Sequence, residues 1–120
     1  MSHFFRAAFC LFTLVITFNS VTFADGNPAK GKVNFDKLCA QCHGTLGAGD
    51  GPVGASLPPN MKPADMTKAQ FKFVTDLTKF TELLHKGGAA VGLNPLMSPQ
   101  ASLSDQDIAD LYAYVQSLKK

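Results

Sequence analysis

Two cysteines and a histidine lie within five residues of one another, at Cys39, Cys42 and His43. Thiolate sulfur and imidazole nitrogen both bind zinc, and two cysteines separated by two residues also form redox-active thiol pairs. The same spacing with a histidine directly after the second cysteine is the pattern by which haem is attached covalently. The segment is therefore compatible with a zinc site, a thiol–disulfide couple or a haem.

The zinc and thiol interpretations each lack a partner feature. A structural zinc site takes four ligands, usually from two separated pairs, and His85 is the one other cysteine or histidine after residue 24. A reactive thiol pair of the thioredoxin kind begins a helix in a fold built on strands, because the helix N-terminus lowers the thiol pKa. Here the pair ends a predicted helix and no β-α-β pattern is visible. The zinc site and the thiol pair are therefore the less favoured alternatives.

A covalently held haem accounts for all three side chains. Two thiols separated by two residues reach the two vinyl groups of protoporphyrin and form thioethers, and the next residue lies under the iron with its imidazole as a ligand. We therefore expect Cys39 and Cys42 to carry one covalent haem c and His43 to be an axial iron ligand.

A helix must present this motif, and residues 27–38 predict one. Pro28 is favourable in a first helical turn, and Val33, Phe35 and Leu38 are spaced to face a core. The cysteine motif itself is expected to close that helix.

Residues 44–62 contain five glycines and three prolines, which predicts a long structured loop without regular elements. Within it, residues 49–54 match the G-x-G-x-x-G spacing of a dinucleotide-binding turn. That motif works only between a strand and a helix, and here Pro52 interrupts it and no apolar strand precedes it. Nucleotide binding is therefore disfavoured, and the glycines are interpreted as backbone that passes one face of a flat ligand.

Two more helices are predicted. The first spans residues 76–86, with apolar residues on one face and a glycine pair as its stop signal. The second spans 105–118, with Ser104 as N-cap and Asp107 as the capping-box partner. Its apolar residues recur every three or four positions, at Ile108, Leu111, Tyr112, Val115 and Leu118. No strand signal of comparable strength exists in the sequence, so the fold class is predicted to be all-α.

The first 24 residues predict a secretory signal that is removed. Arg6 and the amino terminus supply positive charge, residues 7–18 form an uncharged apolar run, and residues 22–24 end in the small residue that signal peptidase reads. An uncleaved membrane anchor is the less favoured alternative, because a span needs roughly 20 apolar residues. We therefore expect a signal peptide at 1–24, a periplasmic mature chain at 25–120 and no stable membrane insertion.

The predicted mature chain is short and nearly neutral. Cleavage removes Cys10, and the two remaining cysteines are too few and too close for a disulfide framework. Ten lysines and no arginine stand against nine acidic residues, so no dense basic surface for nucleic acid is expected. A chain of this length buries a modest core, which a large apolar prosthetic group would complete.

The sequence resembles the class I c-type cytochromes over essentially all of residues 25–120. Gly31 and Phe35 lie eight and four residues before Cys39, as that family places a glycine and an aromatic in its first helix. Tyr114, in Leu-Tyr-Ala-Tyr-Val, is similar to the last-helix aromatic that crosses this glycine. The resemblance implies an all-α class I cytochrome c fold, with three to five helices and long loops wrapped around one covalently bound haem.

The family resemblance also implies a sixth iron ligand. The available side chains are Met61, Met66, Met97 and His85. Class I cytochromes carry their distal methionine just before the last helix, in a setting like the proline-bounded segment around Met97. We therefore expect Met97 as the second axial ligand, Met61 and Met66 as core residues, and His85 as the competing ligand.

The surroundings of the haem follow from the same resemblance. The carbonyl of Pro52 is the candidate that orients the His43 imidazole. Candidates for the apolar haem contacts are Phe35, Leu57, Phe71, Phe73, Phe80, Leu96 and Tyr114. Lysines that could surround an exposed haem edge and dock an acidic partner are Lys62, Lys68, Lys72, Lys79 and Lys86.

The expected function is single-electron transfer between larger redox proteins by a secreted, periplasmic monohaem cytochrome. No nucleophile with a base, carboxylate pair or open metal position is evident, so the chain is not expected to be an enzyme. Its partners would be membrane or periplasmic reductases and oxidases. The alternatives are a haem c subunit of a periplasmic dehydrogenase or oxidase complex, and a gas sensor in which Met97 is displaced.

Overall fold

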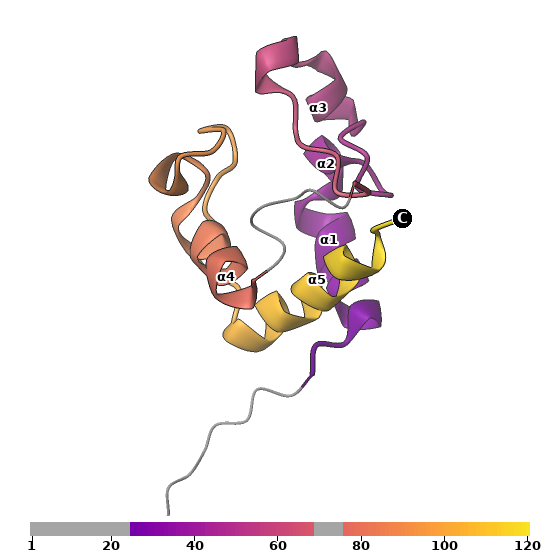
Figure 1. The fold of residues 1–120 in the computed structure, drawn as a ribbon, viewed down its shortest axis with the longest axis vertical. Coiled ribbons are helices and arrows are strands. Elements are labelled where there is room, and N and C mark those ends of the chain that lie inside the picture. The colour runs from indigo at the N-terminus through magenta and orange to yellow at the C-terminus, as the bar shows by residue number, and fades with distance from the viewer. Residues whose placement is uncertain (1–24, 69–75) are drawn as a thin grey trace, which may run out of the picture.

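The computed structural model describes residues 25–68 and 76–120, and every regular element in them is helical (Figure 1). In chain order these are α1 (Pro28–Leu38), α2 (Ala40–His43), α3 (Pro52–Ser56), the 3₁₀ turn η1 (Pro59–Met61), α4 (Leu77–Lys86), the 3₁₀ turn η2 (Ala89–Val91) and α5 (Asp105–Ser117). The predicted all-α class is confirmed. No helix in these two ranges is long and apolar enough to cross a membrane.

The last helix holds the others together. α5 packs against both α1 and α4, and Figure 1 shows it at the base of the fold with α4 on one side. α2 and α3 stack beyond α1 on the other side. The cysteine motif on α2 and the segment that follows α4 therefore belong to opposite sides of the molecule.

α1 begins where Asn27 and Pro28 favour a helix. The side-chain oxygen of Asn27 accepts hydrogen bonds from the backbone N–H groups of Ala29 (2.9 Å) and Lys30 (3.2 Å). Pro28 takes the first helical position, where its missing N–H is of no consequence. The helix predicted at residues 27–38 is confirmed.

Only part of the predicted apolar face of α1 is buried. Phe35 is fully buried, but Val33 is 52% exposed, so its predicted burial is wrong, and Leu38 is 43% exposed. Gly31 and Phe35 lie about one turn apart on the side that meets α5, and Val33 points away because it lies half a turn from both. Leu38 lines the pocket described below.

The cysteine motif does not close α1 but forms a short helix of its own. Cys39 ends α1, and α2 then runs to His43. Gly44 follows with a positive φ of 78°, which glycine adopts without strain. The loop predicted at 44–62 contains α3 and η1, so the absence of regular elements there is wrong. Both begin with a proline, whose restricted φ suits a first helical position.

α4 and α5 begin and end within one residue of their predicted limits. Asp76 caps α4 by accepting a hydrogen bond from the Thr78 N–H (2.8 Å). The predicted capping box of α5 is present: the Asp107 N–H donates to the Ser104 hydroxyl oxygen (3.2 Å), and the Ser104 N–H donates to the Asp107 carboxylate (3.1 Å). The buried apolar residues are Phe80, Leu83 and Leu84 on α4 and Ile108, Ala109, Leu111, Tyr114 and Val115 on α5.

α1 and α5 cross closely at Gly31. A side chain at this position would collide with the Asp110 carbonyl oxygen, so the approach requires glycine. One turn along α1, the rings of Phe35 and Tyr114 meet edge to face with centroids 5.1 Å apart. The crossing at the glycine is as predicted, whereas Tyr114 packs on Phe35 and the atoms nearest to Gly31 belong to Asp110 and Leu111.

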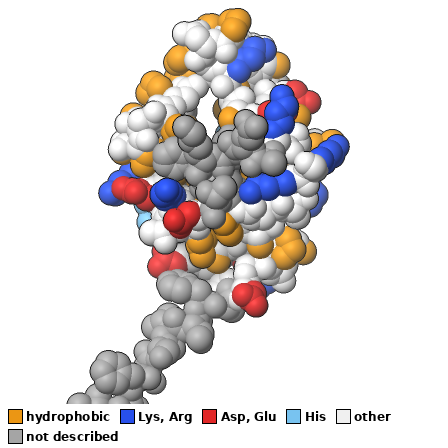
Figure 2. All heavy atoms as spheres, viewed as in Figure 1, with side chains coloured by type: hydrophobic (Ala, Val, Ile, Leu, Met, Phe, Trp, Pro, Cys, Tyr) orange, Lys and Arg blue, Asp and Glu red, His pale blue; other side chains and the backbone are white. Residues whose placement is uncertain are grey.

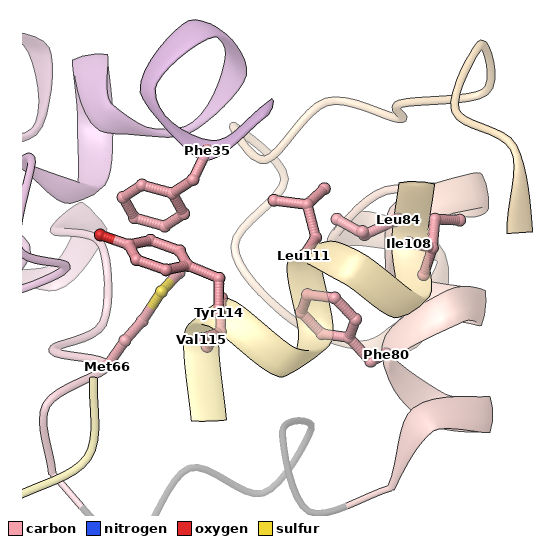
Figure 3. Close-up of a cluster of buried hydrophobic side chains, with 8 residues drawn as sticks. All are labelled: Phe35, Met66, Phe80, Leu84, Ile108, Leu111, Tyr114 and Val115. Carbon is pink, nitrogen blue, oxygen red and sulfur yellow. The ribbon is translucent and has the colours of Figure 1, made fainter. Parts of the chain in front are cut away.

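One cluster of buried side chains forms the core, and Figure 3 shows its members as two neighbouring groups. One lies where α1 meets α5 and consists of Phe35, Met66, Tyr114 and Val115. The other lies where α4 meets α5 and consists of Phe80, Leu84, Ile108 and Leu111. Because α5 contributes to both groups, it sets the distance between the two sides of the fold.

Asp110 is the buried charged side chain among the described residues, with 4% exposure. Its carboxylate accepts hydrogen bonds from the Asn27 backbone N–H (2.7 Å) and from the Gln106 side-chain amide (3.0 Å). The bond from Asn27 ties the start of α1 to α5, and the bond from Gln106 lies within α5. Its burial was not predicted, because a carboxylate near the start of a helix also suits the helix dipole when exposed.

Candidate functional site

A pocket of about 520 Å³ is lined by side chains from both groups of the core. Ligand pockets in proteins generally measure roughly 300–1,000 Å³. The lining is mostly apolar and includes Phe35, Leu57, Phe80, Leu84, Leu96 and Leu111. Such a pocket suits a large apolar ligand that a few polar groups hold in one orientation.

The structure brings all three residues of the cysteine motif to this pocket. Cys39 and Cys42 lie about one helical turn apart and are not joined to each other by a disulfide, and His43 ends the same turn. The backbone N–H of His43 donates to the Cys39 carbonyl oxygen (2.9 Å), and this hydrogen bond closes the turn. Two sulfur atoms and an imidazole are therefore presented on one wall of the cavity.

The environment of the thiols argues against the zinc and redox alternatives. Burial raises the pKa of the Cys39 thiol to about 12, and the neighbouring Cys42 acts in the same direction. A reactive thiol pair needs a lowered pKa instead. Within residues 25–68 and 76–120, no group of three or more His, Cys, Asp and Glu side chains is placed to hold a metal ion.

His43 is held in the form that ligates metals. Burial lowers the pKa of its imidazole, so the ring is neutral. Its Nδ1 lies 3.4 Å from the Ala64 carbonyl oxygen, which accepts a hydrogen bond from Nδ1–H, so the proton stays on Nδ1 and the Nε2 lone pair is left for a metal. The implied role of the Pro52 carbonyl is wrong, since Pro52 begins α3 and does not line the pocket.

The candidates for the second axial position lie in different places. Met97 and Met61 are both half-buried and line the pocket, so the prediction of Met61 as a core residue is wrong. Met66 also reaches the pocket, but it is 6% exposed and belongs to the core as predicted. His85 is exposed and does not line the pocket, and its Nε2 lies 4.0 Å from the Asp105 carboxylate.

Met97 is carried by a turn that starts at Asn94. The Met97 N–H donates to the Asn94 carbonyl oxygen (3.1 Å), and the Gly88 N–H donates to the Met97 carbonyl oxygen (2.8 Å). The Asn94 side-chain amide donates to the carbonyl oxygen of Met61 (2.6 Å). Neither Asn94 nor Ala64 was predicted as a site residue. Asn-Pro is a turn signal that marks Asn94, whereas Ala64 acts through its backbone and leaves no side-chain signal.

Residues 28–119 match the family model for cytochrome c. This chain belongs to the cytochrome c family. The resemblance to class I c-type cytochromes is thereby confirmed, haem c is the covalently bound cofactor, and electron transfer is the chemistry of the protein.

Two known cytochromes are similar to this cytochrome over nearly their whole length. Cytochrome c-554(547) of Halothiobacillus neapolitanus is 36% identical over 99 residues, which cover 78% of this chain and 99% of the relative. Cytochrome c-554(548) of Halomonas halodenitrificans is 36% identical over 95 residues, which cover 77% of this chain and 96% of the relative. Both relatives are themselves cytochromes c, in agreement with the family match.

A solved structure has the same fold. A chain of the reducing HAO-like protein complex of Kuenenia stuttgartiensis superposes on this cytochrome with a TM-score of 0.64 and 22% sequence identity. The match covers 82% of this cytochrome and 46% of that chain. At this identity the likeness concerns the fold alone.

The pocket of this cytochrome suits haem c in its volume and in the donor atoms of its lining. Cys39, Cys42 and His43 supply two thiols and a neutral imidazole on one wall, and Met97 supplies a thioether from a separate segment. The wall between them is apolar, as a porphyrin requires.

Four of the predicted haem contacts line the pocket of the cytochrome: Phe35, Leu57, Phe80 and Leu96. Tyr114 does not, because it packs against Phe35 in the core (Figure 3). Phe71 and Phe73 lie outside the described residues.

Proposed function

We propose that this cytochrome is a periplasmic single-electron carrier whose one haem is attached through Cys39 and Cys42 and ligated by His43 and Met97. The observation that carries the proposal is that these four side chains converge on one apolar pocket. Haem bound there supplies a one-electron couple between ferric and ferrous iron. The Met97 thioether favours the ferrous state and so raises the reduction potential.

The pocket residues favour electron transfer over bond-making chemistry. His43 and Met97 would fill both axial positions, which leaves no open position for a substrate, and the apolar lining keeps water away from the iron. No aspartate or glutamate is among the described residues that line the pocket, so none supplies acid–base catalysis there. We therefore propose that the protein is a carrier and not an enzyme.

We also propose that residues 1–24 are a cleaved signal peptide. The proposal is supported by the uncharged apolar run at 7–18, by the small residue at its predicted cleavage site, and by a family match that begins at residue 28. The intact mass of the exported haem protein tests it. A chain that starts at Asp25 is expected, and retention of the first 24 residues would contradict cleavage.

Redox proteins with an acidic docking surface are the proposed partners. Lys62 lines the pocket, and Lys79 is exposed on α4. Lys68 and Lys86 each pair with a nearby carboxylate, at 3.4 and 2.8 Å, and Lys72 lies outside the described residues. Lysine and carboxylate side chains are interspersed on the face shown in Figure 2. Docking through Lys62 and Lys79 should slow as salt rises, and a rate independent of ionic strength would exclude it.

The optical spectrum of the exported protein is the test of the proposed function. We expect c-type haem bands in the reduced protein and the weak sulfur-to-iron charge-transfer band in the oxidised protein. Haem without the sulfur band would exclude Met97 ligation. Gel filtration of the freshly exported protein separates the two functional candidates, because a carrier elutes alone and a complex subunit elutes with a larger redox chain.

A further inference from the structure

Asn94 connects two segments that both reach the pocket but are far apart in the sequence. Its side-chain amide donates to the Met61 carbonyl oxygen of η1 at 2.6 Å, across a separation of 33 residues. Asn94, Met61 and Met97 all line the cavity, and Asn94 is half-buried. The hydrogen bond therefore links the segment that carries Met97 to η1, which supplies a different part of the pocket lining.

The same side chain also shapes the turn that carries Met97. The Asn94 side-chain oxygen accepts a hydrogen bond from the Leu96 N–H (2.9 Å), and its backbone carbonyl accepts one from the Met97 N–H (3.1 Å). Asparagine at the first position and proline at the second, here Pro95, are the residues that such turns favour. Both ends of the Asn94 amide are therefore used, one within the turn and one in the bond to η1.

The turn is supported by backbone contacts on its other side. The Gly88 N–H donates to the Met97 carbonyl oxygen (2.8 Å), and the Leu93 N–H donates to the Gly88 carbonyl oxygen (2.8 Å). A side chain on Gly88 would collide with the Asn94 carbonyl oxygen, so the turn lies directly on the end of α4. Leu93 and Leu96 are exposed, so these two side chains do not fix the turn by burial. The hydrogen bond from Asn94 to the Met61 carbonyl oxygen connects the turn to η1.

We propose that Asn94 is a positioning residue that holds the turn bearing Met97 closed over the pocket by its amide bond to the Met61 carbonyl. This inference rests on the proposed ligation by Met97. Departure of the thioether from the iron requires the turn to move, and movement away from η1 breaks the bond from Asn94. The bond therefore slows the opening through which an external ligand enters.

Substitutions at Asn94 separate its two contacts. Asn94→Asp keeps the oxygen that accepts from Leu96 but replaces the donor toward Met61 with a carboxylate oxygen, which repels the carbonyl. Asn94→Ser keeps a weaker turn acceptor, and its side chain is too short to reach the Met61 carbonyl oxygen. Both variants retain the turn and lose the link to η1.

Two control variants match these changes elsewhere. Asn60→Asp introduces the same charge at an exposed position of η1, next to Met61. Asn34→Ala removes another side-chain amide bond between elements, the one to the Asp107 carboxylate (3.2 Å), away from the pocket. The first controls for charge and the second for a general loss of stability.

The experiment measures imidazole binding to the oxidised holoprotein at saturating imidazole, where opening of the thioether limits the rate. The Asn94→Asp and Asn94→Ser variants should bind imidazole about fivefold faster than the parent, the effect of losing one hydrogen bond, and both controls should stay within about twofold. The sulfur-to-iron band of each protein is recorded before imidazole is added.

The outcomes separate this inference from the proposed ligation. Parent-like rates in both Asn94 variants, with the sulfur band present throughout, would overturn the positioning role and leave Met97 ligation standing. Absence of the sulfur band from the parent would overturn both. An equal acceleration in Asn34→Ala would show that general loosening causes the effect, and this too would overturn the role of Asn94.

Discussion

Met97 and His85 differ in their position relative to the pocket, and this difference supports Met97 as the proposed ligand. Met97 is half-buried and lines the pocket, whereas His85 is exposed at the end of α4 and lies beside the Asp105 carboxylate. Moving His85 inward would require α4 to unwind at its C-terminal turn, which is packed through Leu83 and Leu84. The geometry therefore favours the methionine.

Replacement of Met97 by histidine tests this assignment. Met97→His should lower the midpoint potential by roughly 0.1–0.3 V, because axial ligands set haem potentials over about 0.8 V and a thioether stabilises ferrous iron. The sulfur-to-iron band should vanish at the same time. Redox titration and the optical spectrum measure the two effects.

Met61→Leu is the matched control, because Met61 is the other half-buried methionine at the pocket. It should keep the sulfur-to-iron band, since leucine removes only the thioether of a residue not assigned to the iron. Loss of the band in Met61→Leu, with retention in Met97→His, would reverse the assignment.

The two cysteines have separate consequences for attachment. Changing Cys39 and Cys42 together to alanine should leave haem extractable by acid acetone, since both thioethers are then absent. Either single alanine variant should retain haem through one bond. The pyridine haemochrome spectrum of the extracted pellet measures what remains, and covalent haem in the double variant would overturn the attachment proposal.

At the scale of elements, the crossing of α1 and α5 depends on the missing side chain of Gly31. Gly31→Ala should lower the free energy of unfolding by roughly 2 kcal/mol, because a methyl group would collide with the Asp110 carbonyl oxygen, which belongs to the rigid backbone of α5. Val33→Ala on the exposed side of α1 should change it by about 0.5 kcal/mol or less. Equal effects in denaturant titrations would show that the crossing is not tight.

The capping box of α5 contributes to the stability of the fold, and this contribution depends on pH through Asp107. The hydrogen bond from the Ser104 hydroxyl is the main cause that lowers the pKa of Asp107, followed by the Ser104 backbone and the Asn34 amide. A carboxyl whose pKa is lower in the folded state stabilises the fold at neutral pH, and this contribution is lost as the pH falls through that lowered pKa.

Ser104→Ala should therefore lower the thermal midpoint by a few degrees at neutral pH. The difference from the parent should shrink as the pH is taken below 3.8, the ordinary carboxyl value. Ser102→Ala, exposed in the preceding turn, should have little effect at either pH. A difference that is constant with pH would mean that Asp107 is not part of the effect.

Local signals predicted the elements that begin and end with capping residues. α4 and α5 agree with the sequence because Asp76, Ser104 and Gly87 act within one turn of the helix that they bound. α3 was missed because its stability depends on packing: a side chain on Gly54, for example, would collide with the Cys42 carbonyl oxygen. Glycine content alone does not reveal such a contact.

The site divides in the same way. Cys39, Cys42 and His43 are contiguous, so their spacing alone predicts their chemistry. The partner of His43 is 21 residues away at Ala64, and the partner of the Asn94 amide is 33 residues away. Both partners are backbone carbonyl oxygens, which every residue has. The sequence therefore does not show which carbonyl will accept the bond until the fold is known.

At the scale of the whole molecule, the pocket makes the stability of the fold depend on haem. A cavity of about 520 Å³ separates α1 and α4, and a small domain has little other core to compensate for leaving it unfilled. The double cysteine variant, after haem extraction, should lose its near-UV circular dichroism and its cooperative thermal transition. A sharp transition in the extracted protein would show that the helices pack without the cofactor.

The bond between Asn27 and Asp110 has a consequence for timing. It joins positions 83 residues apart, and contacts of such separation close late because a long loop must first be ordered. If the chain is exported amino terminus first, as the proposed signal peptide implies, the cysteines of α2 emerge well before α5. Until α5 packs, the pocket wall made by Leu111 and Val115 is missing, so the thiols of Cys39 and Cys42 are open for haem attachment. Because α5 lies at the end of the chain, it packs last, and haem can enter the pocket before the domain is fully folded.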